Sequence, residues 1–345
     1  MPILNCPKPR AGFAKMSIPK INLNKSALRL FNKLVDDADK FGVLVEKSST
    51  GATLVDAGLK AQGGYLAGEL VTEICLAGYG KASVMPVQYG DIVLPSVFIQ
   101  TDHPALSLLG SQFAGWQVKG ENYSAIASGP ARALALKPKG LYVRLNHQEQ
   151  SDIAVIVLET ERIPPETILE QIASKCNVLP KNLYVVMFST TSLSGAVQVS
   201  GRIVETGLHK LERLELDPTT VKHAWGYAPI VPVHPNSGEA MGRTNDAILY
   251  GGVTNYTVDY ENEQELQKIV TQAPSSASEM LQEAKRLAKS NPRFMDIFKD
   301  AGFDFYKIDT NIFAPAVVSI TNKRTGKTFR AGNLDVAVVK SSLGI

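Results

Sequence analysis

The segment 194–214, with the sequence SGAVQVSGRIVETGLHKLERL, limits most strongly how this chain can fold. Most of its faces carry apolar or small side chains, which predicts one helix packed against protein on most sides. Four polar side chains fall within about 60° of one another and form a single stripe: Gln198, Arg202, Glu205 and His209. A packed helix holds a charged stripe only against a partner, water or a ligand cavity. The stripe is therefore a candidate wall of an active site.

The same spacing allows two other interpretations of the stripe. Arg202 and Glu205 are three residues apart and could form an ordinary ion pair on a solvated face. Salt-bridged pairs on helices greatly outnumber catalytic ones, so spacing alone favours this structural interpretation. Glu205 and His209 are four residues apart and could instead be two metal ligands, as on zinc-binding helices. No third ligand is visible in the sequence.

The composition indicates an ordinary soluble globular protein. The chain has 345 residues, of which 44% are hydrophobic and 20% charged, and this length favours two domains over one. The net charge is +3, and the basic residues are spread along the chain without a basic stripe interleaved with aromatic residues. Nucleic acid is therefore disfavoured as a partner. No stretch approaches the apolar length of a membrane span, so membrane insertion is disfavoured too.

Cysteine usage and the N-terminal segment favour the cytoplasm. Cys6, Cys75 and Cys176 are far apart and form no C-x-x-C pair, which disfavours disulfides and structural zinc and fits a reducing compartment. Residues 1–25 are basic and contain four prolines, but they lack the continuous apolar core of a signal peptide. We expect this segment to be a surface arm.

The order of the predicted elements gives the fold class. Residues 24–150 mix helices with strands that we expect to be antiparallel, beginning with an amphipathic helix that Gly42 ends. Residues 151–345 begin with buried strands and helices in β-α-β-α order, which is typical of a layered α/β unit. We therefore expect an α/β (α+β) protein with an arm at 1–23 and two layered domains. A hairpin near residue 325 could return to the first domain.

Two further segments contain candidate ligand-binding residues. Ser128, Gly129 and Arg132 lie where a loop of small residues joins a short helical run, and amide groups at such a start can hold an anion. An ordinary tight turn is the alternative there. Thr244, Asn245 and Asp246 precede a predicted strand at 247–250 and a pair of glycines, a pattern that invites close approach by a ligand.

Five longer motifs, in this order, make the chain resemble the methenyltetrahydromethanopterin cyclohydrolase family: TDHPA, SGPARALALKP, TTSLSGAVQVSGRIVETGLHKL, GYAPIVPV and AMGRTNDAILYGG. The similarity covers about residues 24–338. The tail FDFYKID…IFAPA…TGKTFRAG resembles the bacterial, methylotroph-type members more than the archaeal ones. Several long motifs in order are far more specific than any one of them.

The resemblance implies a cytoplasmic hydrolase of one-carbon metabolism, acting in the formaldehyde oxidation of methylotrophs. The family opens 5,10-methenyl-tetrahydromethanopterin to the 5-formyl derivative without metal or cofactor, because the C1 carrier is itself the substrate. It also implies a homotrimer with the pterin site in a cleft between two α/β domains. The family's catalytic Arg and Glu, three residues apart on a helix, match Arg202 and Glu205.

The chemistry assigns a role to each residue of the stripe. Water is a poor nucleophile that loses a proton as it adds, so Glu205 is expected to be the general base. Arg202 is expected to position Glu205 and tune its charge. Gln198 could orient the water, and His209 could support the site from behind the contacting residues. The other expected contacts to the pterin or its polar tail are Ser128, Gly129, Arg132, Thr244, Asn245 and Asp246.

Two alternatives from other functional classes stay open at the level of sequence. One is a metal-dependent amidohydrolase built on Glu205 and His209. The other is a non-catalytic protein that binds a pterin or phosphate. The intact R-x-x-E pattern argues against the second alternative without excluding it.

Overall fold

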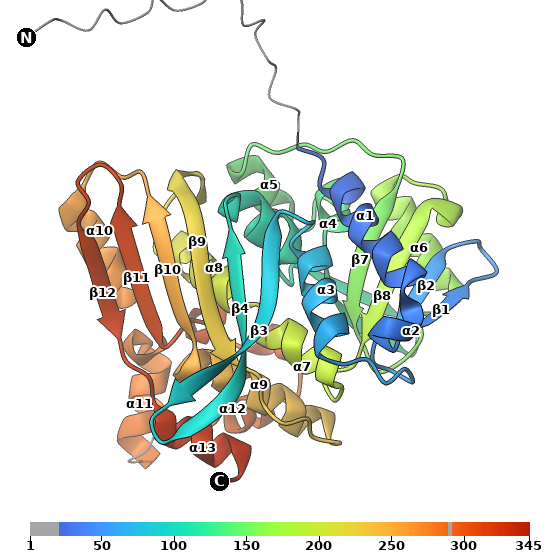
Figure 1. Ribbon diagram of the computed structural model, residues 1–345. Helices are drawn as coiled ribbons and strands as arrows, with labels where there is room; N and C mark the ends of the chain where they lie inside the picture. Colours follow the sequence, from blue (N-terminus) through green and yellow to red (C-terminus); the bar gives the residue numbers. More distant parts are fainter. Residues whose placement is uncertain (1–20, 289–291) are drawn as a thin grey trace, which may run out of the picture.

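The computed structural model describes residues 21–288 and 292–345, which form two six-stranded sheets with helices packed on and between them (Figure 1). The layered α/β class predicted from the sequence is confirmed. The expected N-terminal arm and Cys6 lie outside the described residues, apart from 21–23, and Leu23 already opens the first helix. Within the described part of the chain, no helix combines the length and apolar character needed to cross a membrane.

The first sheet has the strand order β1-β2-β8-β7-β6-β5, with β2, β8 and β7 parallel. Its strands are β1 (Leu44–Lys47), β2 (Thr53–Asp56), β5 (Trp116–Gly120), β6 (Tyr123–Ser128), β7 (Ala154–Glu159) and β8 (Leu183–Phe188). β7 is buried on both faces: Ile156 and Leu158 face a core with α6 (Glu166–Cys176), while Val155 and Val157 face a second core with other helices. This burial explains why the strand reads as a continuous apolar run.

The helices of that second core that pack on β7 are α1 (Leu23–Asp36) and α3 (Tyr65–Cys75). The side chain of Asn22 accepts a hydrogen bond from the Lys25 amide and so caps the start of α1. Gly42 ends the following short helix α2 (Ala38–Phe41) with φ of 63°, a left-handed conformation that glycine adopts without strain. The predicted amphipathic helix is thus confirmed as α1, but it ends at Asp36, and Gly42 ends the separate helix α2.

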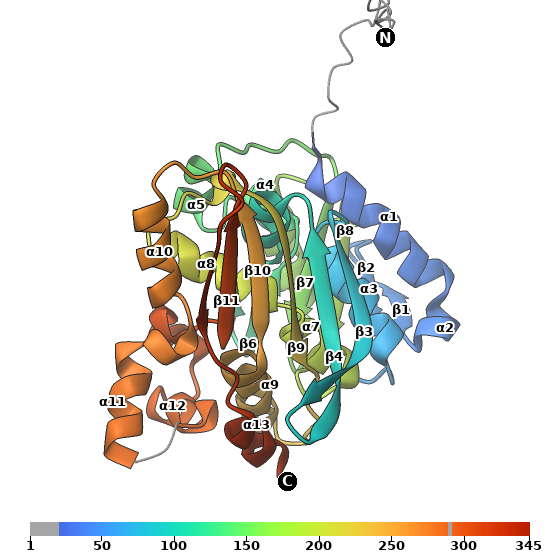
Figure 2. The same cartoon turned by 60° about the vertical axis from the view of Figure 1, so that its left-hand side comes forward.

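The second sheet has the strand order β12-β11-β10-β9-β4-β3. Its strands are β3 (Gly80–Tyr89), β4 (Ile92–Thr101), β9 (Val221–Pro229), β10 (Val253–Val258), β11 (Val317–Asn322) and β12 (Thr328–Gly332). Two helices, α8 (Ile203–Arg213) and α10 (Glu263–Gln272), lie on one side of this sheet (Figure 2). Their apolar faces and that side of the sheet form the largest hydrophobic cluster of the described residues.

The remaining helices connect or flank the two sheets. They are the π-helix η1 (Ala105–Gln112), α4 (Ala131–Ala135), α5 (Lys139–Arg144), α7 (Leu193–Ser200), α9 (Ser237–Gly251), α11 (Glu279–Ala288), α12 (Phe294–Asp300) and α13 (Val336–Leu343). Short 3₁₀ turns include η5 (Phe305–Lys307) and η6 (Thr310–Ile312). α7 packs against α3 and α9 and so sits at the junction of the two sheets.

The predicted division near residue 150 does not coincide with the sheets. β5 and β6 precede it, yet they share the first sheet with β7 and β8; β3 and β4 precede it too, yet they share the second sheet with β9 to β12. The hairpin of β11 and β12 accordingly joins strands from both sides of the boundary. Strand pairing over such sequence separations is decided by tertiary packing, which a local pattern does not reveal.

Two sequence predictions about secondary structure are wrong. The segment 194–214 is not one helix, because α7 ends at Ser200 and α8 begins at Ile203. Gly201 lies at the break, where an added Cβ would be 2.9 Å from Cγ2 of Thr72 on α3. The expected strand at 247–250 is instead the last turn of α9. A short apolar run fits a buried helix as well as a strand, so periodicity could not separate the two.

The packing of α8 on β10 generates a stability prediction. A Cβ on Gly207 would lie 2.1 Å from the hydroxyl of Tyr256, which donates a hydrogen bond of 2.8 Å to the Val204 carbonyl. Gly207→Ala is therefore expected to lower the free energy of unfolding by about 1–3 kcal/mol, although alanine favours helices. In Tyr256→Phe the clashing oxygen is absent, so the double variant should lose less than the sum of the two single losses.

Gly140→Ala in α5 is the matched control, since the nearest atom to its added Cβ is 3.6 Å away on a flexible arginine. Thermal and urea unfolding at equal protein concentration measure the difference. A Gly207→Ala protein as stable as the wild type would contradict the packing described for α8.

Candidate active site

A cavity of about 270 Å³ lies where the two sheets meet. Its walls come from β6 and β7 of the first sheet, from α7, α8 and α9, and from the segments that follow η1 and α12. The residues that line it are Phe113, Ala114, Gly115, Ile126, Pro138, Glu159, Val199, Arg202, Glu205, Thr206, His209, Met241, Asn245, Ile248, Phe305, Tyr306, Thr310 and Phe313. The wall is mostly apolar, so the few charged side chains in it are candidate functional groups.

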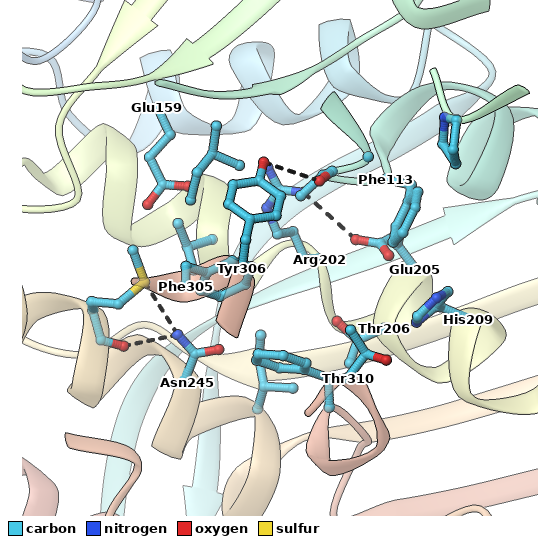
Figure 3. Close-up of a pocket in the computed structure, with 18 residues that line it drawn as sticks. Phe113, Glu159, Arg202, Glu205, Thr206, His209, Asn245, Phe305, Tyr306 and Thr310 are labelled. Atoms are coloured by element: carbon cyan, nitrogen blue, oxygen red, sulfur yellow. Dashed lines mark hydrogen bonds and ion pairs between the residues drawn. The ribbon is translucent and has the colours of Figure 1, made fainter. Parts of the chain in front are cut away.

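Glu205 stands in the first turn of α8 and is only 5% exposed. The adjoining face of α8 is anchored in the core through Val204, Leu208 and Leu211, and Glu205 points into the cavity (Figure 3). No described residue donates a hydrogen bond of 3.5 Å or less to its carboxylate; the nearest cation, Nη1 of Arg202, is 3.6 Å from Oε2. The carboxylate can therefore accept a hydrogen bond from a molecule in the cavity.

Arg202 is held in place by groups other than Glu205. Its Nη1 donates a hydrogen bond of 3.0 Å to the Gln112 carbonyl, and its Nη2 donates one of 2.7 Å to Oγ of Ser128. These partners lie at the end of η1 and the end of β6, so the guanidinium links α8 to both segments. Its position beside Glu205 is thus fixed by the surrounding fold.

Burial raises the pKa of Glu205 to about 7, while the positive charges of Arg202 and Arg132 oppose this rise. Arg132 is fully buried, donates to the carbonyls of Leu109 and Ser111, and lies 5.2 Å from the ring centre of Phe113. A carboxyl group with such a pKa is populated in both protonation states near neutral pH. It suits a group that first takes and then returns a proton.

His209 lines the cavity one turn further along α8. Its imidazole stacks on Phe113 with ring centres 4.7 Å apart. Burial, together with the nearby positive charges of Arg213, Arg144 and Lys210, lowers the pKa of His209 to about 4. The imidazole is therefore neutral at neutral pH and adds no charge to the cavity.

The segment after α12 closes one side of the cavity with aromatic rings. Phe305 and Tyr306 lie on η5, and Phe313 follows η6. The hydroxyl of Tyr306 donates a hydrogen bond of 3.4 Å to the Ala114 carbonyl across the cavity (Figure 3). Flat rings around a charged pair form a site that suits a planar, partly apolar ligand.

Glu159 is a cavity residue that the sequence analysis missed. It is the last residue of β7, is 8% exposed, and accepts a hydrogen bond of 2.6 Å from Oγ1 of Thr190. Burial raises its pKa, and the charge of Arg202 opposes this rise. One signal could have revealed it, since a carboxylate directly after a buried apolar strand marks the strand end where α/β proteins bind ligands.

Of the three candidates on α9, Asn245 alone lines the cavity. Thr244 donates its hydroxyl hydrogen bond to the Ala240 carbonyl within α9. Asp246 is buried elsewhere, where it accepts from the Phe294 amide and from the hydroxyl of Ser342. The sequence analysis placed all three residues at one ligand site because it did not predict a helix here. Three consecutive residues of a helix point in different directions, so only one of them reaches the cavity.

Four other predicted residues do not line the cavity. The break after α7 turns Gln198 away from the stripe, and its Nε2 lies 3.4 Å from Sγ of Cys75. Ser128 accepts the hydrogen bond from Arg202, while Arg132 is sealed behind Gly115, where an added Cβ would be 2.7 Å from its Nη2. The amide of Gly129 donates a hydrogen bond to the Ser111 carbonyl. These four residues therefore support the wall of the cavity from behind, and the expectation that they contact a ligand directly stays a prediction.

Glu205 and His209 line the same cavity, as the metal interpretation of the stripe requires. Among the residues that the structure describes, no group of three or more His, Cys, Asp or Glu side chains gathers as a candidate metal site. Glu159 lines the cavity too, but the described part of the chain does not bring it together with Glu205 and His209 as a metal site, and a protein zinc site has three or four protein ligands.

Comparison with known proteins identifies relatives along nearly the whole chain. Residues 22–343 match the family model described as Cyclohydrolase (MCH). Methenyltetrahydromethanopterin cyclohydrolase of Methanothermobacter marburgensis is 43% identical over 328 residues, covering 94% of this chain and all of the relative. The enzymes so named from Methanocaldococcus jannaschii and Methanococcoides burtonii are 42% and 38% identical, covering 94% of this chain and 98% and 99% of their own.

The burial of Glu205 generates a prediction that needs no substrate. Its carboxyl group is expected to titrate near pH 7 rather than near 4.5, protonated below and ionised above. Infrared difference spectra between wild type and Glu205→Gln isolate its carboxyl stretch as the pH is varied. Glu170→Gln, on the exposed side of α6, is the matched control for a non-cavity glutamate. A Glu205 band that is already lost near pH 4.5 would contradict the described burial.

Proposed function

The chain belongs to the methenyltetrahydromethanopterin cyclohydrolase family, and on this basis we propose that it hydrolyses 5,10-methenyl-tetrahydromethanopterin to 5-formyl-tetrahydromethanopterin, with Glu205 as general base. The observation that carries the catalytic assignment is a buried carboxylate that faces a cavity and whose nearest cationic nitrogen, Nη1 of Arg202, is 3.6 Å away. The bacterial, methylotroph-type affinity, the homotrimer and the cytoplasmic location remain predictions from the family resemblance.

The reaction explains why a base is needed. The substrate carries a cationic amidinium carbon between N5 and N10, and the oxygen of water bonds to that carbon. Glu205 takes one proton from the water as the C–O bond forms, giving a neutral adduct. The C–N10 bond then breaks, N10 receives a proton from the Glu205 carboxyl, and the hydroxyl of the adduct loses its proton to solvent. No electrons are transferred, so the reaction requires no redox cofactor.

The pKa of Glu205, about 7, supports this double role. A base accepts a proton best when its pKa lies close to the working pH, and the same group must later act as an acid. An ionised Glu205 about 4 Å from the amidinium would attract it by about 4 kcal/mol at an effective dielectric constant of 20. That attraction by itself favours substrate binding over turnover.

Arg202 reduces this preference for the bound substrate over the transition state. Its positive charge opposes the rise in the pKa of Glu205, so more of Glu205 is ionised at neutral pH, and it repels the cationic substrate more than the neutral adduct. Hydrogen bonds to Gln112 and Ser128 hold the guanidinium in place as the charge on the substrate changes. We therefore assign Arg202 to positioning and electrostatic tuning rather than to proton transfer.

Replacing the base gives the first kinetic prediction. Glu205→Gln keeps the size of the side chain but cannot accept a proton, so turnover is expected to fall by roughly 10² to 10⁴ while the pterin still binds. Loss of the methenyl chromophore measures turnover, and titration of the same chromophore measures binding. Glu170→Gln should retain wild-type turnover. Near wild-type turnover in Glu205→Gln would remove Glu205 from the mechanism.

Replacing the cation gives the second kinetic prediction. Arg202→Ala removes a charge that lowers the pKa of Glu205, so the pKa should rise and the base should be protonated over a wider pH range. The rising limb of the pH–rate profile is expected to move to higher pH, together with a lower maximal rate. Arg202→Lys, which keeps the charge but not the planar fork, should shift the limb less. An unchanged profile in Arg202→Ala would argue against the tuning role.

The two alternative functions are tested by the same assay. A metal-dependent amidohydrolase built on Glu205 and His209 should lose activity after exhaustive chelation and regain it with zinc. A non-catalytic binding protein should shift the spectrum of the methenyl substrate without consuming it. Consumption that is unaffected by the chelator would support metal-free hydrolysis and count against both alternatives.

A further inference from the structure

A second, more polar cavity of about 370 Å³ adjoins the first. The two cavities share Ile126, Glu159 and Met241 as lining residues, so Glu159 stands at their junction. In the view of Figure 3, Glu159 and Glu205 lie on opposite sides of Tyr306, with Arg202 behind. A planar ligand that reaches Glu205 through the first cavity therefore extends toward Glu159.

The carboxylate of Glu159 is only partly satisfied. Oε1 accepts the hydrogen bond from Thr190, but no residue in the described ranges donates to Oε2, and no cationic side chain there lies within 4 Å of it. The side chain is 92% buried, given its exposure of 8%. Because Glu159 lines both cavities, Oε2 is free to accept a hydrogen bond from a ligand or water there.

The surroundings of Glu159 define which ligand groups fit. Glu161, Thr160, Thr190 and Asn236 also line the second cavity, and no Lys or Arg of the described residues does. Glu161 accepts a hydrogen bond of 2.8 Å from the hydroxyl of Ser189. Two carboxylates without a cation repel phosphate and carboxylate groups but attract N–H donors. This end of the cleft therefore suits a neutral, donor-rich edge rather than an anionic tail.

We propose that Glu159 is a substrate-orienting residue that binds the N3–H and 2-amino edge of the pterin's pyrimidine ring. This inference rests on the proposed function, which supplies a pterin as the ligand. The two N–H groups of that edge are adjacent and parallel, and they match the two oxygens of a carboxylate as a guanidinium does. Each carboxylate oxygen accepts more than one hydrogen bond, so Thr190 can keep its bond to Oε1.

This contact also sets the direction in which the substrate lies. With the pyrimidine edge at Glu159, the amidinium carbon lies toward Glu205, on the other side of Tyr306. The polar tail then leaves the cleft away from Glu159 and Glu161. Glu159 and Glu205 thus divide recognition and chemistry between the two sides of the cleft. The donors of the pterin edge stabilise the ionised form of Glu159 against the effect of its burial.

The test compares two tail-less probes as competitive inhibitors of the wild-type enzyme. Tetrahydropterin carries both N–H donors, whereas tetrahydrolumazine has an oxygen in place of the 2-amino group. Loss of one charge-assisted hydrogen bond, with an oxygen facing Oε2 instead, should make the lumazine bind about 10- to 100-fold more weakly. Equal inhibition by the two probes would overturn the inference, and this arm needs no variant to fold.

The variant arm assigns the discrimination to Glu159. Glu159→Gln is expected to raise KM about 10- to 100-fold with kcat within about threefold of wild type, and to reduce the preference for tetrahydropterin to less than about threefold. Glu170→Gln, on the exposed side of α6 and outside both cavities, is the matched control and should keep both the wild-type KM and the preference. A merely structural role for Glu159 would lower stability without changing the preference between probes.

The outcomes separate this inference from the proposed function. A wild-type protein that does not consume the methenyl substrate would refute the proposed function. A wild-type protein that consumes it, with Glu159→Gln retaining KM and the preference for tetrahydropterin, would refute only the role of Glu159. Circular dichroism and thermal unfolding of each variant show whether a changed KM reflects the site or the fold.

Discussion

The site depends on one contact: the carboxylate of Glu205 is buried beside the guanidinium of Arg202, but the two groups do not form a close ion pair. In a buried ion pair with short contacts, Glu205 would be ionised and its carboxylate oxygens would already be hydrogen-bonded to the cation. Here the two groups lie 3.6 Å apart, and Arg202 makes its hydrogen bonds to Gln112 and Ser128 instead. The carboxylate therefore keeps a pKa of about 7 and free oxygens that face the cavity.

The break between α7 and α8 makes this arrangement possible. Gly201 allows α7 to approach α3 closely, and the chain turns at Arg202 before α8 begins. α8 then packs tightly on the second sheet at Gly207, which fixes the direction in which Glu205 points. Because the partners of Arg202 come from η1 and β6, one side chain links the helix of the second sheet to the first sheet.

The cleft between the sheets contains two carboxylates at different positions: Glu205 lines the first cavity, and Glu159 lies where the first and second cavities meet. Glu205 projects from a helix of the second sheet, and Glu159 ends a strand of the first. Aromatic rings from the C-terminal part of the chain lie between and beside them. The two sheets thus contribute distinct groups, and their relative placement determines the distance between the reacting centre and the edge that is recognised.

The sequence by itself determined the α/β class, the buried strands β7 and β8, the amphipathic helix α1, and the pairing of Arg202 with Glu205. Each of these follows from local periodicity or from motif resemblance, which neighbouring residues encode. Tertiary structure alone decided that Gln198 leaves the stripe, that Asn245 but not Asp246 reaches the cavity, and that Glu159 joins Glu205 across the cleft. These outcomes depend on a helix break forced by packing and on strand pairing between distant segments, and neither is encoded in a local pattern.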